Sequence, residues 1–257
     1  MTFNSQKILS SIQEKKAFKV ISGINNLKVE EVIKIAEASE AGDATYIDIA
    51  ANPSLVYNVR AHTVLPICVS TIDPNNLAQC IAVGADAVEI GNYECFYSLG
   101  HQFSATAILQ ITSRAKELLG GTGIPLTVTI PHILPIEEQV SLALKLEAYG
   151  VDMIQTEGKS VGYENNDTVS VIAKANYTLA MTYEVSKVCS LPIITSSGLS
   201  DLTAPMAIGI GASGVGIGDA ISSLATIEEM TKKIRQISGV IHQFRPNLRY
   251  YNNSIIS

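Results

Sequence analysis

The sequence alternates short apolar segments with segments of helical periodicity, and this alternation repeats eight times between residues 18 and 242. The apolar segments are four to six residues long and rich in β-branched side chains, as expected of parallel strands buried on both faces. No G-x-G-x-x-G follows the first strand, which favours a closed barrel over a doubly wound open sheet. We therefore predict an α/β fold, a single (β/α)₈ TIM barrel over residues 1–245, followed by a polar tail at 246–257.

The helical segments are predicted from apolar spacing and from proline or glycine at their ends. They cover about 29–41, 53–62, 73–84, 105–119, 135–150, 168–188 and 226–242, with a further helix beginning near Thr203 and Pro205. An additional N-terminal helix precedes the first strand, with Ile8, Leu9 and Ile12 on one face. That segment lacks the apolar core of a secretory signal.

Composition restricts the partners and the compartment. The chain has 257 residues, is 47% hydrophobic and only 16% charged, and carries a net charge of −6 without any Lys/Arg-rich run. Nucleic acid and anionic membranes are therefore poor partners, and no apolar run is long enough to span a bilayer. The four cysteines form no C-x-x-C pair, so we expect no metal site; Cys68, Cys80 and Cys189 are expected to be buried thiols in a reducing compartment.

The segment 192–220 predicts an anion site. Two adjacent strands end in Ser197-Gly198 and in Gly216-Ile217-Gly218, as do the strands that form the phosphate site of many barrels. Lys159 is a candidate cation, whereas Asp219 would repel a phosphate. Alternatively, the glycines only form turns. If the anion site exists, Gly198→Val or Gly218→Val should obstruct it at a modest cost in stability.

Two carboxylates lie within apolar strands, Asp48 in Y-I-D-I-A and Glu89 in A-V-E-I. A lone buried charge costs several kcal/mol, so each is expected to be paired or to have a raised pKa, with Lys19 as the partner. They form either a catalytic acid/base pair or a structural core network. Carboxylates facing a ligand cavity would indicate an enzyme, and carboxylates locked against Lys19 would favour a binding protein.

Other polar residues fall at the carboxyl ends of the predicted strands, where barrel chemistry lies. His132 and Glu157 are candidate acid/base groups, although His132 also fits an ordinary loop. The polar loop 158–167 is predicted to be a mobile lid. The aromatic loop 92–103 is predicted to form a pocket wall or to pack over the barrel mouth. The remaining strand-end polar residues are Ser22, Ser70, Asn92, Thr129 and Gln155.

Several motifs together resemble one protein family. They include K-V-I-S-G-I-N-N, V-E-I-G-N-Y-E, T-I-P-H-x-L-P, I-Q-T-E-G and S-S-G-L-S-x-x-T-A-P-M-A-I. The combination, spanning about Lys19 to Ala220, is similar to the plastid and cyanobacterial family called hypothetical chloroplast reading frame twenty-three. The resemblance implies a TIM barrel in the plastid stroma, or in the cytoplasm of a cyanobacterium, and it implies no reaction. The last motifs also resemble, more distantly, phosphate-binding barrels such as N-acetylmannosamine-6-phosphate epimerase and thiazole synthase.

These observations leave three functions open. The first is an enzyme, an isomerase, epimerase or lyase, that acts on a small phosphorylated metabolite. The second is a non-catalytic barrel that binds such a ligand and regulates a partner. The third is an FMN-dependent oxidoreductase, because barrel phosphate sites also hold FMN.

Overall fold

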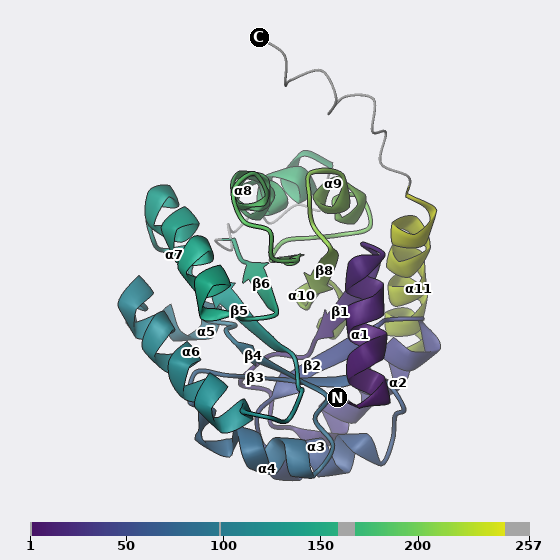
Figure 1. Cartoon of the computed structure of the whole chain (residues 1–257). Coiled ribbons are helices and arrows are strands. Elements are labelled where there is room, and N and C mark those ends of the chain that lie inside the picture. Colours follow the sequence, from purple (N-terminus) through teal and green to yellow (C-terminus); the bar gives the residue numbers. More distant parts are fainter. Residues whose placement is uncertain (1, 98, 159–167, 245–257) are drawn as a thin grey trace.

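Eight parallel strands close into a barrel in the computed structural model, which describes residues 2–97, 99–158 and 168–244. Each strand pairs with the next along the chain, and β1 pairs with β8, so the predicted TIM barrel is confirmed (Figure 1). The strands are β1 (Ala17–Ile21), β2 (Tyr46–Ala50), β3 (Ile67–Thr71), β4 (Ala87–Ile90), β5 (Leu126–Ile130), β6 (Met153–Thr156), β7 (Ile193–Ser196) and β8 (Gly214–Ile217).

The helices surround this barrel and follow the predicted segments closely (Figure 1). They are α1 (Phe3–Gln13), α2 (Val29–Ala41), α3 (Pro53–Arg60), η1 (Pro74–Asn76), α4 (Leu77–Ala82), α5 (Glu94–Tyr97), α6 (Ala105–Leu119), α7 (Ile136–Tyr149), α8 (Thr168–Ser186), α9 (Ala204–Gly209), α10 (Asp219–Ser222) and α11 (Ile227–Gln243). The helix expected over 73–84 is divided into η1 and α4. The short helices α5 and α10 were not predicted, because one helical turn has no periodicity to detect.

The two faces of each strand have different neighbours. Outward side chains such as Val20, Ile47 and Val88 pack in the main core beneath the helices. Inward side chains at the amino ends of the strands form a separate apolar cluster with two residues of α1, Ile8 and Ile12. Helix α1 therefore lies across this end of the barrel (Figure 1) and closes it. Any ligand must approach from the opposite end, where the carboxyl ends of the strands lie.

Several expectations concern exposure and the ends of the chain. Cys68, Cys80 and Cys189 are buried free thiols, as predicted. Among the described helices, none combines the length and apolar character needed to cross a bilayer. The polar tail at 246–257 and the proposed lid residues 159–167 lie outside the described residues.

Candidate functional site

The inward face of the barrel changes from apolar to polar along the strands. Ala17, Tyr46, Ala87 and Met153 belong to the apolar cluster at the amino end. Because strand side chains alternate, the next inward position is two residues further along each strand. Those positions hold a layer of buried polar side chains, the polar layer, which comprises Lys19, Asp48, Ser70, Glu89, Thr129, Gln155 and Ser196. The chemistry that the barrel can perform is therefore concentrated at its carboxyl end.

Lys19 lies between the two strand carboxylates, as the sequence predicted. Its Nζ contacts Glu89 Oε2 and lies 3.7 Å from Asp48 Oδ2, and all three side chains are about 1% exposed. Burial lowers the pKa of Lys19, but the charges of Glu89 and Asp48 together outweigh burial and leave this pKa raised. The ammonium is therefore held in its charged form.

The surroundings of Asp48 perturb the pKa of its carboxyl group. Ser70 Oγ donates to its Oδ1 at 2.5 Å, and Asn92 Nδ2 donates to its Oδ2 at 2.8 Å. Burial raises the pKa of Asp48, and Glu89 adds to this, whereas Lys19 and the two hydrogen bonds oppose it; the result is a pKa of about 6. The single positive charge of Lys19 thus faces two carboxylates. These three side chains, Lys19, Asp48 and Glu89, are called the trio below, and they carry a net charge of −1 when both carboxylates are ionised.

Glu89 is held from the other side of the barrel. Thr129 Oγ1 donates to its Oε1 at 3.0 Å, and Gln155 Nε2 donates to the same oxygen at 2.8 Å. Gly91 makes this approach possible, because a Cβ at that position would overlap Thr129 Oγ1. Among the buried side-chain polar atoms of the described residues, Gln155 Oε1 and Ser22 Oγ have no hydrogen-bond partner.

A second cluster brings together His132 and Glu157, which the sequence analysis had proposed separately. Glu157 Oε1 accepts from the backbone N–H of His132 at 3.1 Å, from Tyr97 Oη at 2.6 Å, and lies 3.1 Å from His132 Nδ1. Burial, together with the charge of Glu157 and its hydrogen bond, raises the pKa of Tyr97. The cluster is a carboxylate–imidazole pair whose carboxylate oxygen is crowded with donors.

Two residues that sequence reasoning missed hold this cluster in place. Tyr177 of α8 donates its hydroxyl to the His132 carbonyl at 2.9 Å, and Gln139 of α7 donates to Tyr177 Oη at 2.7 Å. Gln139 could have been found from the sequence, because its helical spacing to Leu142, Ala143 and Leu146 puts a polar residue on the buried, apolar side of α7. No sequence pattern pointed to Tyr177, since only tertiary packing places it beside His132.

The aromatic loop after β4 also forms part of a surface hollow. This hollow has a volume of about 300 Å³ and is lined by Tyr97, Gly100, His101, Gln102 and Ile133. The rings of Tyr97 and His132 meet edge to face, with centroids 4.8 Å apart. The loop thus packs beside the His132–Glu157 cluster and lines a surface hollow, the first of the two arrangements expected for it.

The candidate anion loops lie side by side, since β7 pairs with β8. Ser197 and Gly198 both have left-handed backbone, with φ of 74° and 68°, a turn conformation that aligns successive N–H groups. Gly216 lies within β8 rather than after it. A Cβ there would come within 3.2 Å of Lys19 Cε, so this glycine makes room for the lysine stem. Gly218 precedes α10, which begins at Asp219.

The expectation of a modest stability cost fails for Gly198. Its φ is left-handed, and a Cβ would overlap the backbone carbonyl oxygen of Lys174 on α8, which a side-chain movement cannot relieve. At Gly218 the nearest atom, Ile21 O, lies 3.3 Å from the Cβ position, so substitution there is more tolerable. Lys159, the candidate cation, lies outside the described residues.

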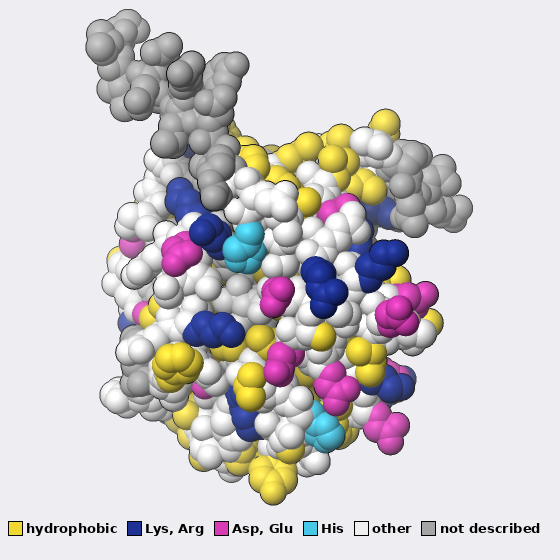
Figure 2. Space-filling view, turned by 90° about the vertical axis from the view of Figure 1, so that its right-hand side faces the viewer, with side chains coloured by type: hydrophobic (Ala, Val, Ile, Leu, Met, Phe, Trp, Pro, Cys, Tyr) yellow, Lys and Arg dark blue, Asp and Glu magenta, His cyan; other side chains and the backbone are white. Residues whose placement is uncertain are grey.

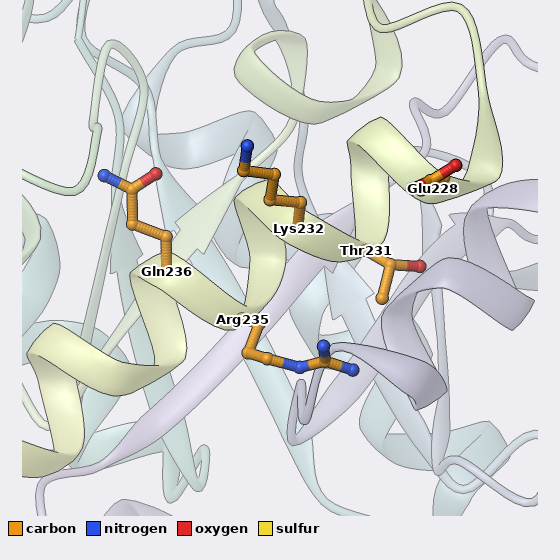
Figure 3. A pocket seen from close by; sticks show the side chains of 5 residues that line it. All are labelled: Glu228, Thr231, Lys232, Arg235 and Gln236. Atoms are coloured by element: carbon orange, nitrogen blue, oxygen red, sulfur yellow. The ribbon is translucent and has the colours of Figure 1, made fainter.

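A hollow of about 510 Å³ lies on the outer side of the molecule, along α11 (Figure 3). Lys232 and Arg235 both line this hollow, but their side chains extend away from each other (Figure 3), so their charged groups do not converge on one point. Basic and acidic side chains are interspersed on the surrounding face (Figure 2). In the described part of the chain, no group of three or more His, Cys, Asp or Glu residues could hold a metal ion.

The closed barrel with its polar layer at the carboxyl end defines a TIM-barrel protein. Solved barrels of similar shape include (S)-3-O-geranylgeranylglyceryl phosphate synthase from Thermoplasma acidophilum in complex with its substrate sn-glycerol-1-phosphate, with a TM-score of 0.64 and 15% identity; the match covers 94% of this chain and 99% of that one. A 3-hexulose-6-phosphate synthase has a TM-score of 0.63 and 16% identity over 87% of this chain and 99% of its own. At such identities the likeness establishes the fold.

Sequence comparison identifies the family. The profile described as "Protein of unknown function (DUF561)" matches residues 3–246, and the chain therefore belongs to this family. A relative from Antithamnion sp., "Uncharacterized protein ycf23", is 42% identical over 247 residues, which is 92% of this chain and 88% of the relative. The predicted resemblance is confirmed. The ycf23 relatives come from algae, and their name is that of a plastid gene.

Proposed function

We propose that this barrel binds a small phosphorylated metabolite at the carboxyl ends of its strands and catalyses a proton transfer on it, as in an isomerase, epimerase or lyase. The observation that carries this proposal is the composition of the polar layer. One buried lysine faces two buried carboxylates, and the pKa of one of them, Asp48, is about 6. A carboxyl group with such a pKa can both give and take a proton near neutral pH.

A purely structural ion pair explains the trio less well. Burying charges is costly, and a core network that served stability alone would balance them. Here a second carboxylate, Asp48, is present in addition to Glu89, and it accepts hydrogen bonds from Ser70 and Asn92. We therefore assign proton transfer to Asp48, with Lys19 and Glu89 fixing its position and charge. His132, bound to Glu157, is a second candidate for proton transfer.

The phosphate group is assigned to the loops after β7 and β8. Adjacent strands deliver both loops to one end of the barrel, and backbone N–H groups around Ser197-Gly198 and Gly218 are the expected donors. The likeness to barrels whose names include phosphorylated compounds, sn-glycerol-1-phosphate among them, supports this choice. Asp219 opposes it, because its carboxylate would repel a phosphate at close range.

A non-catalytic, regulatory barrel is the second candidate, and the burial of the trio favours it. Lys19, Asp48 and Glu89 are locked together at about 1% exposure, the arrangement expected of a binding protein. For catalysis, the carboxyl-end loops have to move aside before a ligand reaches the layer. The two functions share the phosphorylated ligand and differ in whether Asp48 exchanges a proton with it.

Binding is tested with ligand pairs that differ only in a phosphate group. Thermal unfolding and calorimetric titration of the wild type with sn-glycerol-1-phosphate against glycerol, and with FMN against riboflavin, give the phosphate contribution. We expect tighter binding of the phosphorylated member and weaker binding in Gly218→Val. Equal affinities within every pair would refute the anion site, and preferential binding of FMN would favour the oxidoreductase.

Catalysis is tested by proton exchange. A phosphorylated compound that binds and that has a C–H bond next to a carbonyl group is incubated with the protein in D₂O, and NMR follows deuterium incorporation at that carbon. We expect incorporation with the wild type, at least a hundredfold less with Asp48→Asn, and a wild-type rate with Glu138→Gln, which changes an exposed carboxylate on α7. Tight binding without any exchange would favour the regulatory barrel.

A stromal location is the last part of the proposal, and it is supported by the plastid relatives. Fractionation of isolated plastids with an antibody against the chain is expected to place it in the stroma. Recovery with the thylakoid or envelope fraction would contradict this.

A further inference from the structure

The amide of Gln155 is fixed in one orientation by its neighbours. Its Nε2 donates to Glu89 Oε1 at 2.8 Å and to Thr129 Oγ1 at 3.2 Å. Turning the amide over would place its carbonyl oxygen against the Glu89 carboxylate, where no hydrogen bond forms and two negative oxygens repel. Glu89 therefore determines that the nitrogen faces the carboxylate and that Oε1 is left as a committed acceptor.

Within residues 2–97, 99–158 and 168–244, no group donates a hydrogen bond to that acceptor. Gln155 is 1% exposed, and Oε1 is one of the two buried side-chain polar atoms without a hydrogen bond among the described residues. The side chain faces the barrel interior, because Met153, two residues earlier on β6, belongs to the interior cluster. A buried carbonyl oxygen without a donor is unfavourable, since buried polar groups are nearly always satisfied. The position is thus prepared for a donor that the described residues do not supply.

We propose that a hydroxyl group of the ligand donates its hydrogen bond to Gln155 Oε1. The inference rests on the proposed phosphorylated ligand and narrows it to hydroxylated compounds, namely phosphates of polyols or sugars. A carbonyl or carboxylate in that place would present a second acceptor and is excluded by the same geometry. The loops after β7 and β8 would then bind the phosphate of the ligand, and strand β6 would bind its hydroxyl.

The other buried side-chain atom without a hydrogen-bond partner among the described residues is Oγ of Ser22, just after β1. A serine hydroxyl rotates and both donates and accepts, so Ser22 binds a hydroxyl or a carbonyl equally well. Selectivity for a hydroxyl therefore depends on Gln155, whose amide cannot turn over without losing its contact with Glu89.

The test compares ligands that differ only in one hydroxyl. The first pair is sn-glycerol-1-phosphate and 1,3-propanediol monophosphate, and the second is ribose 5-phosphate and 2-deoxyribose 5-phosphate. In at least one pair we expect the wild type to bind the hydroxylated member about tenfold to a hundredfold more tightly, because the deoxy compound leaves the carbonyl unpaired. Calorimetric titration measures each dissociation constant.

Two variants test whether Gln155 causes the preference for the hydroxylated ligand. Gln155→Met, which keeps the length of the side chain and removes the carbonyl, should bind both members of the pair alike. Thr129→Val is the matched control, because it removes one contact of Nε2 and one of Glu89 but keeps the Gln155 carbonyl, so the variant's preference for the hydroxylated ligand should persist. Circular dichroism of each variant verifies the fold, and the wild-type comparison stands without any variant.

The outcomes separate this inference from the proposed function. Equal wild-type affinities within both pairs, or a preference that persists in Gln155→Met, would overturn the hydroxyl contact and leave water as the donor to Oε1. The phosphate requirement is measured independently with glycerol against sn-glycerol-1-phosphate, and its loss would overturn the proposed function. Failure of all four phosphates to bind would overturn the assigned ligand class.

Discussion

Lys19 Nζ of β1 lies 3.7 Å from Asp48 Oδ2 of β2, inside a barrel layer where both side chains are about 1% exposed. Because Lys19 also contacts Glu89, the ammonium cannot neutralise Asp48 fully. Burial therefore raises the pKa of Asp48 to about 6 despite the lysine. This relationship makes the stability of the protein depend on pH in a direction that can be measured.

Asp48→Asn should change that pH dependence. A carboxyl whose pKa is raised on folding, from 3.8 to about 6, stabilises the fold fully below pH 3.8 and loses this contribution as the pH rises through about 6. The variant lacks this loss. Its free energy of unfolding relative to wild type should therefore improve between pH 4 and pH 7, by on the order of 2 kcal/mol. Urea unfolding at several pH values measures it.

The control for this measurement is Glu138→Gln, which neutralises an exposed carboxylate and should change little over the same pH range. A difference between Asp48→Asn and wild type that is constant from pH 4 to pH 7 would contradict the raised pKa of Asp48.

Lys19→Met should be strongly destabilising at neutral pH. It leaves two buried carboxylates without their cation, and breaking a buried ion pair on one side costs about 3–5 kcal/mol. The loss should shrink as the pH falls, because protonation removes the stranded charges. Adding Glu89→Gln to Lys19→Met should restore part of the stability at pH 7. A double variant no more stable than Lys19→Met would argue against charge as the cause.

Glu157→Leu should loosen the His132 cluster. It leaves the Tyr97 hydroxyl, the His132 N–H and the His132 ring without their common acceptor, at a cost of about 2–4 kcal/mol. Glu157→Gln retains an acceptor oxygen and should cost less. Chemical unfolding of both variants gives the comparison. Equal losses would mean that packing, rather than hydrogen bonding to Oε1, is what Glu157 supplies.

Alanine substitutions at two glycines should change the stability of the protein in opposite directions. Gly91→Ala should destabilise the barrel and disturb Thr129, since the new Cβ would overlap Thr129 Oγ1. Gly239→Ala on α11 should stabilise the protein by about 0.5–1 kcal/mol, because nothing lies within 4 Å of the Cβ position and alanine favours a helix. Thermal unfolding should shift the two midpoints in opposite directions. A stabilised Gly91→Ala would contradict the close approach.

Sequence by itself determined the architecture, because the architecture depends on local periodicity. Buried parallel strands are continuous apolar runs, and helices such as Val29–Ala41 and Ala105–Leu119 were predicted to their terminal residues by their spacing and end signals. The pairing of Lys19 with Asp48 and Glu89 was also predictable. A charge in an apolar strand needs a partner, and few were available in a chain with 16% charged residues.

Tertiary structure alone decided which strand-end residues meet. His132 and Glu157 were each recognised, but their shared contact with Tyr97 and the support from Tyr177 depend on barrel closure, which brings distant segments together. The steric demand at Gly198 depends likewise on the backbone of α8, 24 residues earlier at Lys174. The free acceptor of Gln155 follows from hydrogen bonds to β4 and β5. Such contacts join residues far apart in the chain, and local sequence patterns therefore do not predict them.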